Sequence, residues 1–279
     1  MIAAISKILK KKLSKKNYNL IKKIYNFKTR NYDLSADLKH NENIFKILKF
    51  DIEKIKNRLS KLEYSYTSEN LSWHYHLFAG LKDHFKDKKI KILEIGTFEG
   101  EFTNFISNIY EDSEIDTIDL DDNDKLFLNS YVRNDKSNYD KFLKLRSKNL
   151  SRHNINFYKF NSINIKKYFS EKKFDLIWVD GDHLKPQVII DIINCLDLMK
   201  EDGILCTDDV IKSFKFEKMN PEFKKNSNVS RDGFITLNHF EINNVLKNYY
   251  FVKRINKKNF YLKKYVSLSI FRKNKIIVN

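Results

Sequence analysis

Short apolar runs alternate with amphipathic segments through the middle of this chain. The runs have the length of buried strands, and apolar residues at helical spacing follow some of them, as in 101–110 and 188–199. The expected strands are 91–95, 115–120, 156–160, 174–179 and 204–207. Strands that alternate with helices predict an α/β fold with a parallel sheet covered on both faces. Ligands of such sheets bind at the carboxyl ends of the strands.

The C-terminal part breaks this alternation. Residues 234–238, 250–255 and 265–271 are rich in aromatic and β-branched side chains, which predicts strands. We expect a turn rich in lysine and asparagine to join the last two. Arg231-Asp232-Gly233 is expected to be a turn that leads into the first of the three.

The N-terminal part has helical periodicity. Apolar residues recur between lysines in 2–27, and 29–43 is expected to be a polar connector. Apolar positions at spacings of three and four predict one helix over 45–62 that packs on the body, with a homodimer seam as the alternative. We therefore expect a basic helical N-terminal extension over residues 1–70, and a second domain over 71–279 that begins with a helix at 71–85.

Positive charge is concentrated at the two ends. Residues 1–30 contain ten Lys/Arg and residues 251–279 contain nine, with no acid in either segment. The ends therefore carry +19 and the body −2 of a formal charge of +17. Such basic ends favour binding to an anionic membrane surface or to another polyanion. The alternative is that their lysine-rich faces are simply solvated. A nucleic-acid groove is disfavoured, because the body lacks basic residues interleaved with aromatic ones.

Cysteine content and hydropathy indicate the compartment. Cys195 and Cys206 lie in apolar patterns, so we expect them to be buried and reduced. No run of about 18 apolar residues predicts a membrane-spanning helix, and the charged N-terminus is unlike a secretory signal. The expected location is cytoplasmic, with peripheral attachment to the inner membrane face through the basic ends.

Residues 92–100, Ile-Leu-Glu-Ile-Gly-Thr-Phe-Glu-Gly, contain the most informative pattern. An apolar strand ends in Glu94-x-Gly96-x-x-x-Gly100, directly before a segment with helical periodicity. Glycine permits close approaches that a side chain would block, and a helix N-terminus presents free N–H groups to an anion. The pattern predicts that a ligand with a carboxylate or phosphate binds here. An ordinary strand–turn–helix is the alternative.

This order of residues resembles motif I of class I S-adenosylmethionine (SAM) methyltransferases rather than the G-x-G-x-x-G of dinucleotide enzymes. The resemblance covers about residues 71–275. It implies a Rossmann-like, seven-stranded, mostly parallel sheet with helices on both faces and a C-terminal antiparallel hairpin, with SAM as the cofactor. The cofactor contacts that it implies are Glu94, Gly96, Thr97, Gly100, Asp119, Asn161, Ser162 and Asp180.

Two of these contacts have a chemical rationale of their own. Asp119 ends a strand 23 residues after Gly96, where a carboxylate can accept hydrogen bonds from both ribose hydroxyls. Asn161 stands where the family often has an acid that contacts the adenine amino group. Its amide oxygen could accept the same hydrogen bond.

Acidic residues also end two apolar strands. The segments are F-D-L-I-W-V-D-G-D-H over 174–183 and G-I-L-C-T-D-D over 203–209. Like charges brought together cost free energy unless something neutralises them. Three carboxylates, Asp180, Asp208 and Asp209, suit a hard divalent cation such as Mg²⁺ or Mn²⁺.

These segments are similar to the metal-dependent O-methyltransferases of the catechol and caffeoyl-CoA type, and more similar to the methyltransferase domain 24 group. The resemblance implies metal ligation by Asp180, Asp208 and Asp209, with Asp209 in place of the usual asparagine. His183 stands where those enzymes have a lysine base, so His183 and Asp180 are the expected catalytic residues. A metal-free site, in which Asp208 and Asp209 orient acceptor hydroxyls, is the alternative.

The resulting hypothesis is that the protein is a SAM-dependent methyltransferase. It would methylate a hydroxyl on a small molecule, saccharide or glycolipid precursor, either with or without the help of a divalent metal ion. Two alternatives come from other classes. One is a nicotinamide-dependent oxidoreductase on a similar sheet. The other is a non-catalytic membrane- or polyanion-binding protein that retains the fold.

Overall fold

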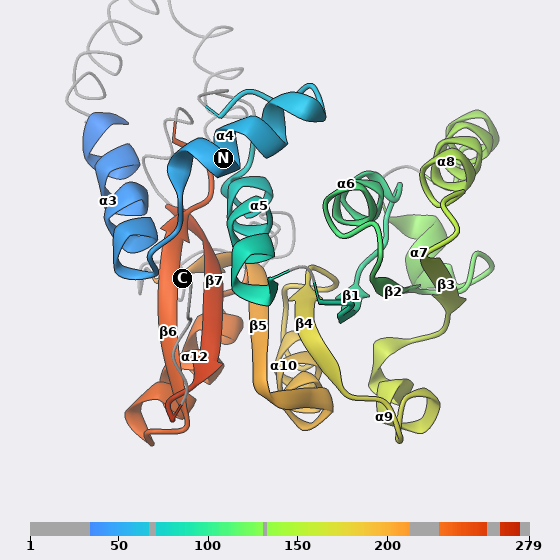
Figure 1. The fold of residues 1–279 in the computed structure, drawn as a ribbon. Coiled ribbons are helices and arrows are strands. Elements are labelled where there is room, and N and C mark those ends of the chain that lie inside the picture. The colour runs from blue at the N-terminus through green and yellow to red at the C-terminus, as the bar shows by residue number, and fades with distance from the viewer. Residues whose placement is uncertain are drawn as a thin grey trace, which may run out of the picture.

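The computed structural model describes residues 34–66, 71–86, 88–130, 133–212, 229–255 and 263–273. A seven-stranded sheet crosses the molecule in the order β3-β2-β1-β4-β5-β7-β6 (Figure 1). Its strands are β1 (Lys91–Ile95), β2 (Glu114–Asp119), β3 (Ile155–Lys159), β4 (Phe174–Val179), β5 (Met199–Ile211), β6 (Leu246–Val252) and β7 (Lys264–Phe271). The first five strands are parallel, and β7 runs antiparallel to both β5 and β6. The predicted Rossmann-like, seven-stranded α/β sheet is confirmed.

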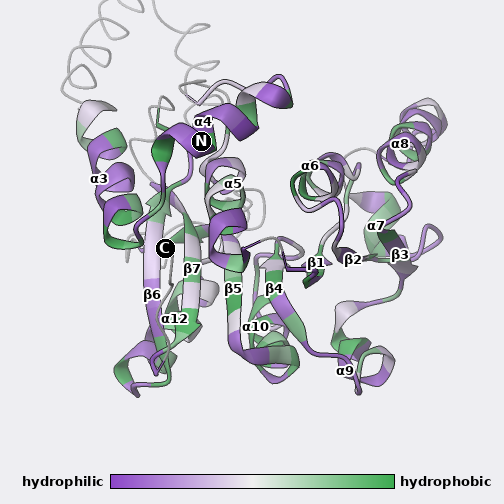
Figure 2. Cartoon of the chain, viewed as in Figure 1, coloured by the Kyte–Doolittle hydropathy of each residue, from purple (hydrophilic) through white to green (hydrophobic). Residues whose placement is uncertain are grey.

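Helices cover both faces of this sheet. The helical segments are α3 (Leu34–Ile47), α4 (Ile52–Lys61), α5 (Trp73–Phe85), α6 (Glu101–Ile109), α7 (Lys125–Asn129), α8 (Lys136–Asn149), η1 (Ser162–Asn164), α9 (Ile165–Tyr168), α10 (Gln187–Leu198) and α12 (Arg231–Ile242). One hydrophobic core lies under α3, α4, α5 and α6, and a second lies under α9, α10 and α12. The central strands β1 and β4 are buried on both faces, which is why their sequences are nearly continuous apolar runs. Figure 2 shows β4 coloured mostly as hydrophobic.

The C-terminal segment corrects one prediction. Residues 234–238 are not a strand but part of α12. Ser230 is the N-cap of this helix, and its hydroxyl accepts a hydrogen bond from the N–H of Gly233 at 2.9 Å. The expected turn at 231–233 is therefore the first turn of the helix. Leu237 is buried in the second core, so packing outweighs the β-propensity of the run.

The N-terminal segment corrects two more. Most of the expected polar connector at 29–43 is helical, because α3 begins at Leu34. The single helix expected over 45–62 is two helices that meet at Asp51, whose carboxylate caps α4 by accepting from the N–H groups of Glu53 and Lys54. The apolar pattern at 2–27 lies outside the described residues.

Helix α3 covers the outer edge of the sheet. Asn41, which is fully buried, donates to the carbonyl oxygen of Val252 at 3.0 Å and accepts from its N–H at 2.8 Å. This side chain thus satisfies backbone groups that an open edge strand would expose. Phe45 packs against Trp73 and Phe251, as predicted for a helix that packs on the body. Every helix in the described ranges is too short or too polar to cross a membrane.

Candidate active site

The predicted site residues lie at or near the carboxyl ends of the parallel strands β1 to β5. The chain passes outward from β1 to β2 and β3, then returns to β4 on the other side of β1. In such sheets, the strand ends at a reversal of strand order are the usual ligand position. The turn after β1 and the loop after β4 therefore border the same space.

The turn after β1 requires its glycines. Gly96 has φ +99°, and a Cβ there would lie 2.3 Å from the carbonyl oxygen of Asp180. The N–H of Asp180 also donates to the carbonyl oxygen of Ile95 at 2.8 Å, which joins the two strand ends. Gly100 has φ +71° and is the N-cap of α6. The turn is thus a backbone cradle beside a helix N-terminus, which fits the carboxylate end of SAM.

Glu94 lies beneath this turn and is fully buried. Its carboxylate accepts hydrogen bonds from Thr103 and, at 2.6 Å, from Thr117. Thr117 in turn accepts from the hydroxyl of Thr97 at 2.7 Å. Burial raises the pKa of Glu94 from 4.5 to about 7, although both hydroxyl bonds oppose the shift. Glu94 and Thr97 therefore connect the turn to β2 and α6, and their described contacts are internal.

Asp119 ends β2 beside the same turn. Its two carboxylate oxygens accept from the N–H groups of Phe98 and Leu120, both at 2.8 Å. Burial raises the pKa of Asp119, whereas these two hydrogen bonds lower it. Each oxygen keeps a second lone pair that could accept from a ligand hydroxyl. The geometry is compatible with the predicted ribose contact.

Asn161 and Ser162 follow β3 and have internal partners. The side chain of Asn161 accepts from the N–H of Ile163 at 3.0 Å and caps η1. Ser162 accepts from the amide of Gln187 at 2.7 Å, and Gln187 also donates to Asp191 at 2.8 Å. Burial raises the pKa of Asp191 to about 6. These bonds tie the loop after β3 to α10, the helix that follows the β4 loop.

Asp180 and His183 lie together in the loop after β4. The Nε2 atom of His183 is 3.5 Å from Asp180 Oδ1 and 3.9 Å from Asp209 Oδ2. Burial lowers the pKa of His183, with Asp209 and Asp208 acting in the opposite direction. Burial and the negative charge of Asp208 raise the pKa of Asp180. A neutral imidazole at this edge of the sheet has the form that a proton acceptor needs.

Asp208 and Asp209 reach the same place by means of a bulge in β5. The register with β7 shifts between Thr207 and Val210, and Asp209 has φ +49°. Consecutive side chains of a regular strand point to opposite faces, and a bulge re-aims them. The ammonium of Lys253 consequently lies 2.5 Å from Asp208 Oδ2 and 2.7 Å from Asp209 Oδ1, and Lys264 lies 2.9 Å from Asp209 Oδ2.

Lys253 and Lys264 are the site residues that the sequence analysis missed. Burial lowers the pKa of Lys253, but Asp208 and Asp209 outweigh it and raise that pKa well above 10.5. A signal was present, because a pair of acids in an apolar strand needs a cation nearby. Lys253 directly follows the apolar end of β6.

The predicted metal ligands do not fit a divalent cation in this arrangement. Lys253 is already bonded to both Asp208 and Asp209, so a metal ion would have to displace an ammonium from these oxygens. Within the described ranges, no group of three or more His, Cys, Asp or Glu side chains is arranged to hold a metal ion. The charge that the acids require is supplied by lysines.

The aromatic and histidine side chains near the start of α5 belong to the core. Trp73 stacks on His76 at 4.4 Å between ring centroids, and His76 Nε2 bonds to the carbonyl oxygen of Tyr66 at 2.6 Å. Burial lowers the pKa of His76 to about 4. His74 contacts the Trp178 ring at 5.1 Å between centroids. His74 therefore packs between α5 and the sheet, whereas His76 packs against Tyr66, which precedes α5.

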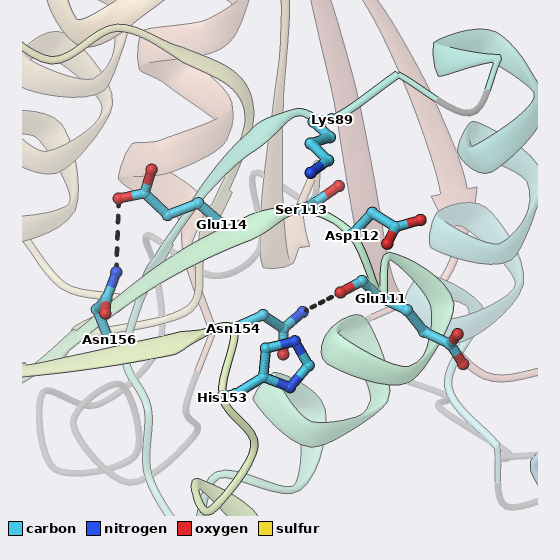
Figure 3. A pocket seen from close by; sticks show the side chains of 8 residues that line it. All are labelled: Lys89, Glu111, Asp112, Ser113, Glu114, His153, Asn154 and Asn156. Atoms are coloured by element: carbon cyan, nitrogen blue, oxygen red, sulfur yellow. Dashed lines mark hydrogen bonds between the residues drawn. The ribbon is translucent and has the colours of Figure 1, made fainter.

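A cavity of about 340 Å³ lies at the opposite edge of the sheet (Figure 3). Its lining residues come from the amino ends of β1, β2 and β3 and the segments that precede them: Lys89, Glu111, Asp112, Ser113, Glu114, His153, Asn154 and Asn156. Asn154 donates to the carbonyl oxygen of Glu111, and Asn156 donates to Glu114, at 3.2 and 3.5 Å. None of the predicted site residues lies in this cavity.

Comparisons with known proteins found a matching family model and solved structures of similar fold. Residues 93–210 match the family model Methyltransf_24, described as a methyltransferase domain. Solved structures with a similar fold include an O-methyltransferase from Bacillus cereus in complex with SAH (11% identity, 85% of this chain, 100% of that chain, TM-score 0.49). Another is the O-methyltransferase TomG from Streptomyces achromogenes in complex with SAM (14% identity, 84% and 98%, TM-score 0.46). No curated protein matches the chain.

The matched segment begins in β1, ends in β5 and contains the glycine turn, Asp119, the β4 loop and the acid pair. The match covers less than half of the chain, and this segment is similar to a methyltransferase domain.

Proposed function

We propose that this protein is a SAM-dependent methyltransferase that transfers the methyl group to a hydroxyl oxygen of a small molecule or saccharide. The observation that carries the proposal is the meeting of the glycine turn with Asp180 and His183. Gly96 contacts the backbone of Asp180, and His183 lies three residues further on. A proton acceptor thus lies beside the place where the cofactor's sulfonium group would present its methyl group.

Each group would have one task. The turn at Gly96 and the N-terminus of α6 would hold the carboxylate of SAM, and Asp119 would accept from its ribose hydroxyls. SAM supplies an activated methyl group on sulfur. His183 would take the proton of the acceptor hydroxyl, with Asp180 orienting the imidazole. The main contribution of the protein is alignment of the acceptor oxygen with the methyl carbon.

Calorimetric titration with SAM tests the cofactor assignment. We expect SAM to bind the wild-type protein, and Asp119→Asn to weaken binding by about 10- to 100-fold, because one charged acceptor of two hydroxyl groups is lost. Asp121→Asn is the matched control, since this exposed acid is in the same turn and should leave SAM affinity unchanged. Titration with NADH in place of SAM would reveal an oxidoreductase. Binding of neither ligand would contradict the proposal.

The acceptor is the less defined half of the proposal. A saccharide or glycolipid precursor at a membrane face would make use of the basic ends, most of whose residues lie outside the described ranges. Transfer of labelled methyl from SAM to a panel of catechols, free sugars and lipid-linked sugars identifies the class. Pelleting with anionic vesicles, with and without residues 1–30, tests membrane attachment. Equal pelleting of both forms would remove the support for a lipid-linked acceptor.

A further inference from the structure

The ammonium of Lys253 occupies the position that the sequence pattern assigns to a metal ion. It is bonded to Asp208 and Asp209 in a site where the three side chains are 14%, 2% and 3% exposed. These acids come from β5, and Lys253 comes from the end of β6, with β7 between the two strands. The contact is thus created by the tertiary fold and by the bulge that aims both acids at one point.

The backbone of Lys253 is held from both sides. Its N–H donates to the carbonyl oxygen of Lys264 at 2.9 Å, and its own carbonyl oxygen accepts from the N–H of Trp73 at 2.8 Å. The preceding residue, Val252, is bonded through both backbone groups to the buried side chain of Asn41. Helices α3 and α5 therefore fix the point from which this lysine side chain extends.

The site also keeps hydrogen-bonding capacity for a ligand. An ammonium has three N–H donors, and among the described residues two of them have carboxylate partners. The Oδ1 atom of Asp208 is buried and has no hydrogen-bond partner in the described part of the chain. A buried acceptor without a partner is costly unless a ligand supplies one.

We propose that Lys253 is the resident cation of the acceptor site, where it excludes a divalent metal ion from Asp180, Asp208 and Asp209. Its third N–H would donate to the acceptor oxygen, and Asp208 Oδ1 would accept from a neighbouring hydroxyl of the acceptor. As the acceptor oxygen bonds to the methyl carbon, the carbon–sulfur bond breaks with its electron pair on sulfur, and the hydroxyl proton passes to His183. This contact with the acceptor rests on the proposed O-methylation, whereas exclusion of the metal does not.

Mn²⁺ titration of the full-length protein tests the exclusion, with SAM titration of the same samples. We expect wild type to bind SAM equally with EDTA or Mn²⁺ and to show no Mn²⁺ binding at millimolar concentration. Lys253→Gln frees the carboxylates, so its Mn²⁺ affinity should rise at least about tenfold, with a higher thermal midpoint when Mn²⁺ is added. Lys264→Gln is the matched control and should remain without Mn²⁺ binding, because Lys253 stays in place.

Two results would overturn the inference. One is Mn²⁺ binding by wild type that Asp208→Asn abolishes. The other is a folded Lys253→Gln protein, as judged by circular dichroism, that gains no affinity for Mn²⁺. Should Lys253→Gln fail to fold, Lys253→Arg replaces it as the test. This variant keeps the cation and must exclude Mn²⁺ as wild type does, so Mn²⁺ binding by Lys253→Arg would contradict the inference. Loss of SAM binding in wild type would instead contradict the proposed function, so the two failures are distinguishable.

Discussion

Two groups of buried acids lie at the carboxyl edge of this sheet, and they are stabilised differently. Glu94 is surrounded by neutral hydroxyl donors, and burial raises its pKa to about 7. Asp208 and Asp209 are bonded to ammonium groups. A hydroxyl satisfies a hydrogen bond but leaves the desolvation cost of the charge, whereas an ammonium also offsets the charge. The first group is therefore sensitive to pH, and the second is sensitive to loss of its lysine.

Removal of Lys253 should have the largest effect on stability. Lys253→Met leaves two carboxylates buried without their cation, which typically costs about 3–5 kcal/mol of unfolding free energy. Urea denaturation measures this change. Lys166→Met is the matched control, because its pair with Asp197 is about half exposed and should contribute almost nothing.

The same experiment can separate charge from packing. Adding Asp208→Asn and Asp209→Asn to Lys253→Met removes the uncompensated charges, so most of the lost stability should return. A triple variant no more stable than the single one would show that the alkyl chain of Lys253, rather than its charge, supports the site.

Glu94→Gln should stabilise the protein at alkaline pH. The folded-state pKa of about 7 lies above the unfolded value of 4.5, so the folded state binds a proton more tightly. The stability due to this proton is fully present below pH 4.5 and is lost as pH rises through 7. A neutral glutamine avoids that loss, and we expect a gain of about 3 kcal/mol at pH 8 that disappears below pH 4.5.

Thermal unfolding of wild type and Glu94→Gln across this pH range measures the difference. The two stability curves should converge in acid and separate above neutrality. Parallel curves would mean that the pKa of Glu94 is the same in the folded and unfolded states, because its hydroxyl partners compensate its burial.

Thr117→Val should have a smaller effect of the opposite sign. The substitution preserves shape but removes the hydroxyl that donates to Glu94 and accepts from Thr97. We expect a loss of about 1–2 kcal/mol, greater at pH 8 than at pH 5 because the ionised carboxylate gains more from a donor. In the Glu94→Gln background the pH dependence of this loss should vanish, and its persistence would assign it to another group.

The sequence predicted one of these two groups better than the other, and the reason is geometric. Glu94, Gly96 and Gly100 lie within seven consecutive residues, so their strand–turn–helix arrangement follows from local pattern. Lys253 lies 44 residues beyond Asp209 and meets it through strand pairing that no local pattern specifies. The acids at the ends of β4 and β5 could be predicted, but the cation between Asp208 and Asp209 could not.

The same distinction between local pattern and tertiary contact explains where the predicted fold was right and where it was wrong. Strands β1 and β4 were predictable because burial on both faces makes them nearly continuous apolar runs. Residues 234–238 have strand-like composition but become helical, because Ser230 caps the helix and Leu237 packs in the second core. Helix α3 has the polar sequence of a connector, because polar residues such as Asn41 are buried against the sheet edge where apolar ones are expected.

Lys264→Gln should have the smallest effect and thereby sharpens the comparison. Lys264 pairs with Asp209 at 2.9 Å, but its side chain is 27% exposed, and Lys253 still compensates the same acid. Solvent screening should limit the loss to roughly 0.5–1 kcal/mol, decreasing with added salt. Denaturation at low and high ionic strength measures it. A loss as large as that of Lys253→Met would mean that the two lysines act as one unit, and that compensation at this site depends on total charge rather than on the buried ammonium alone.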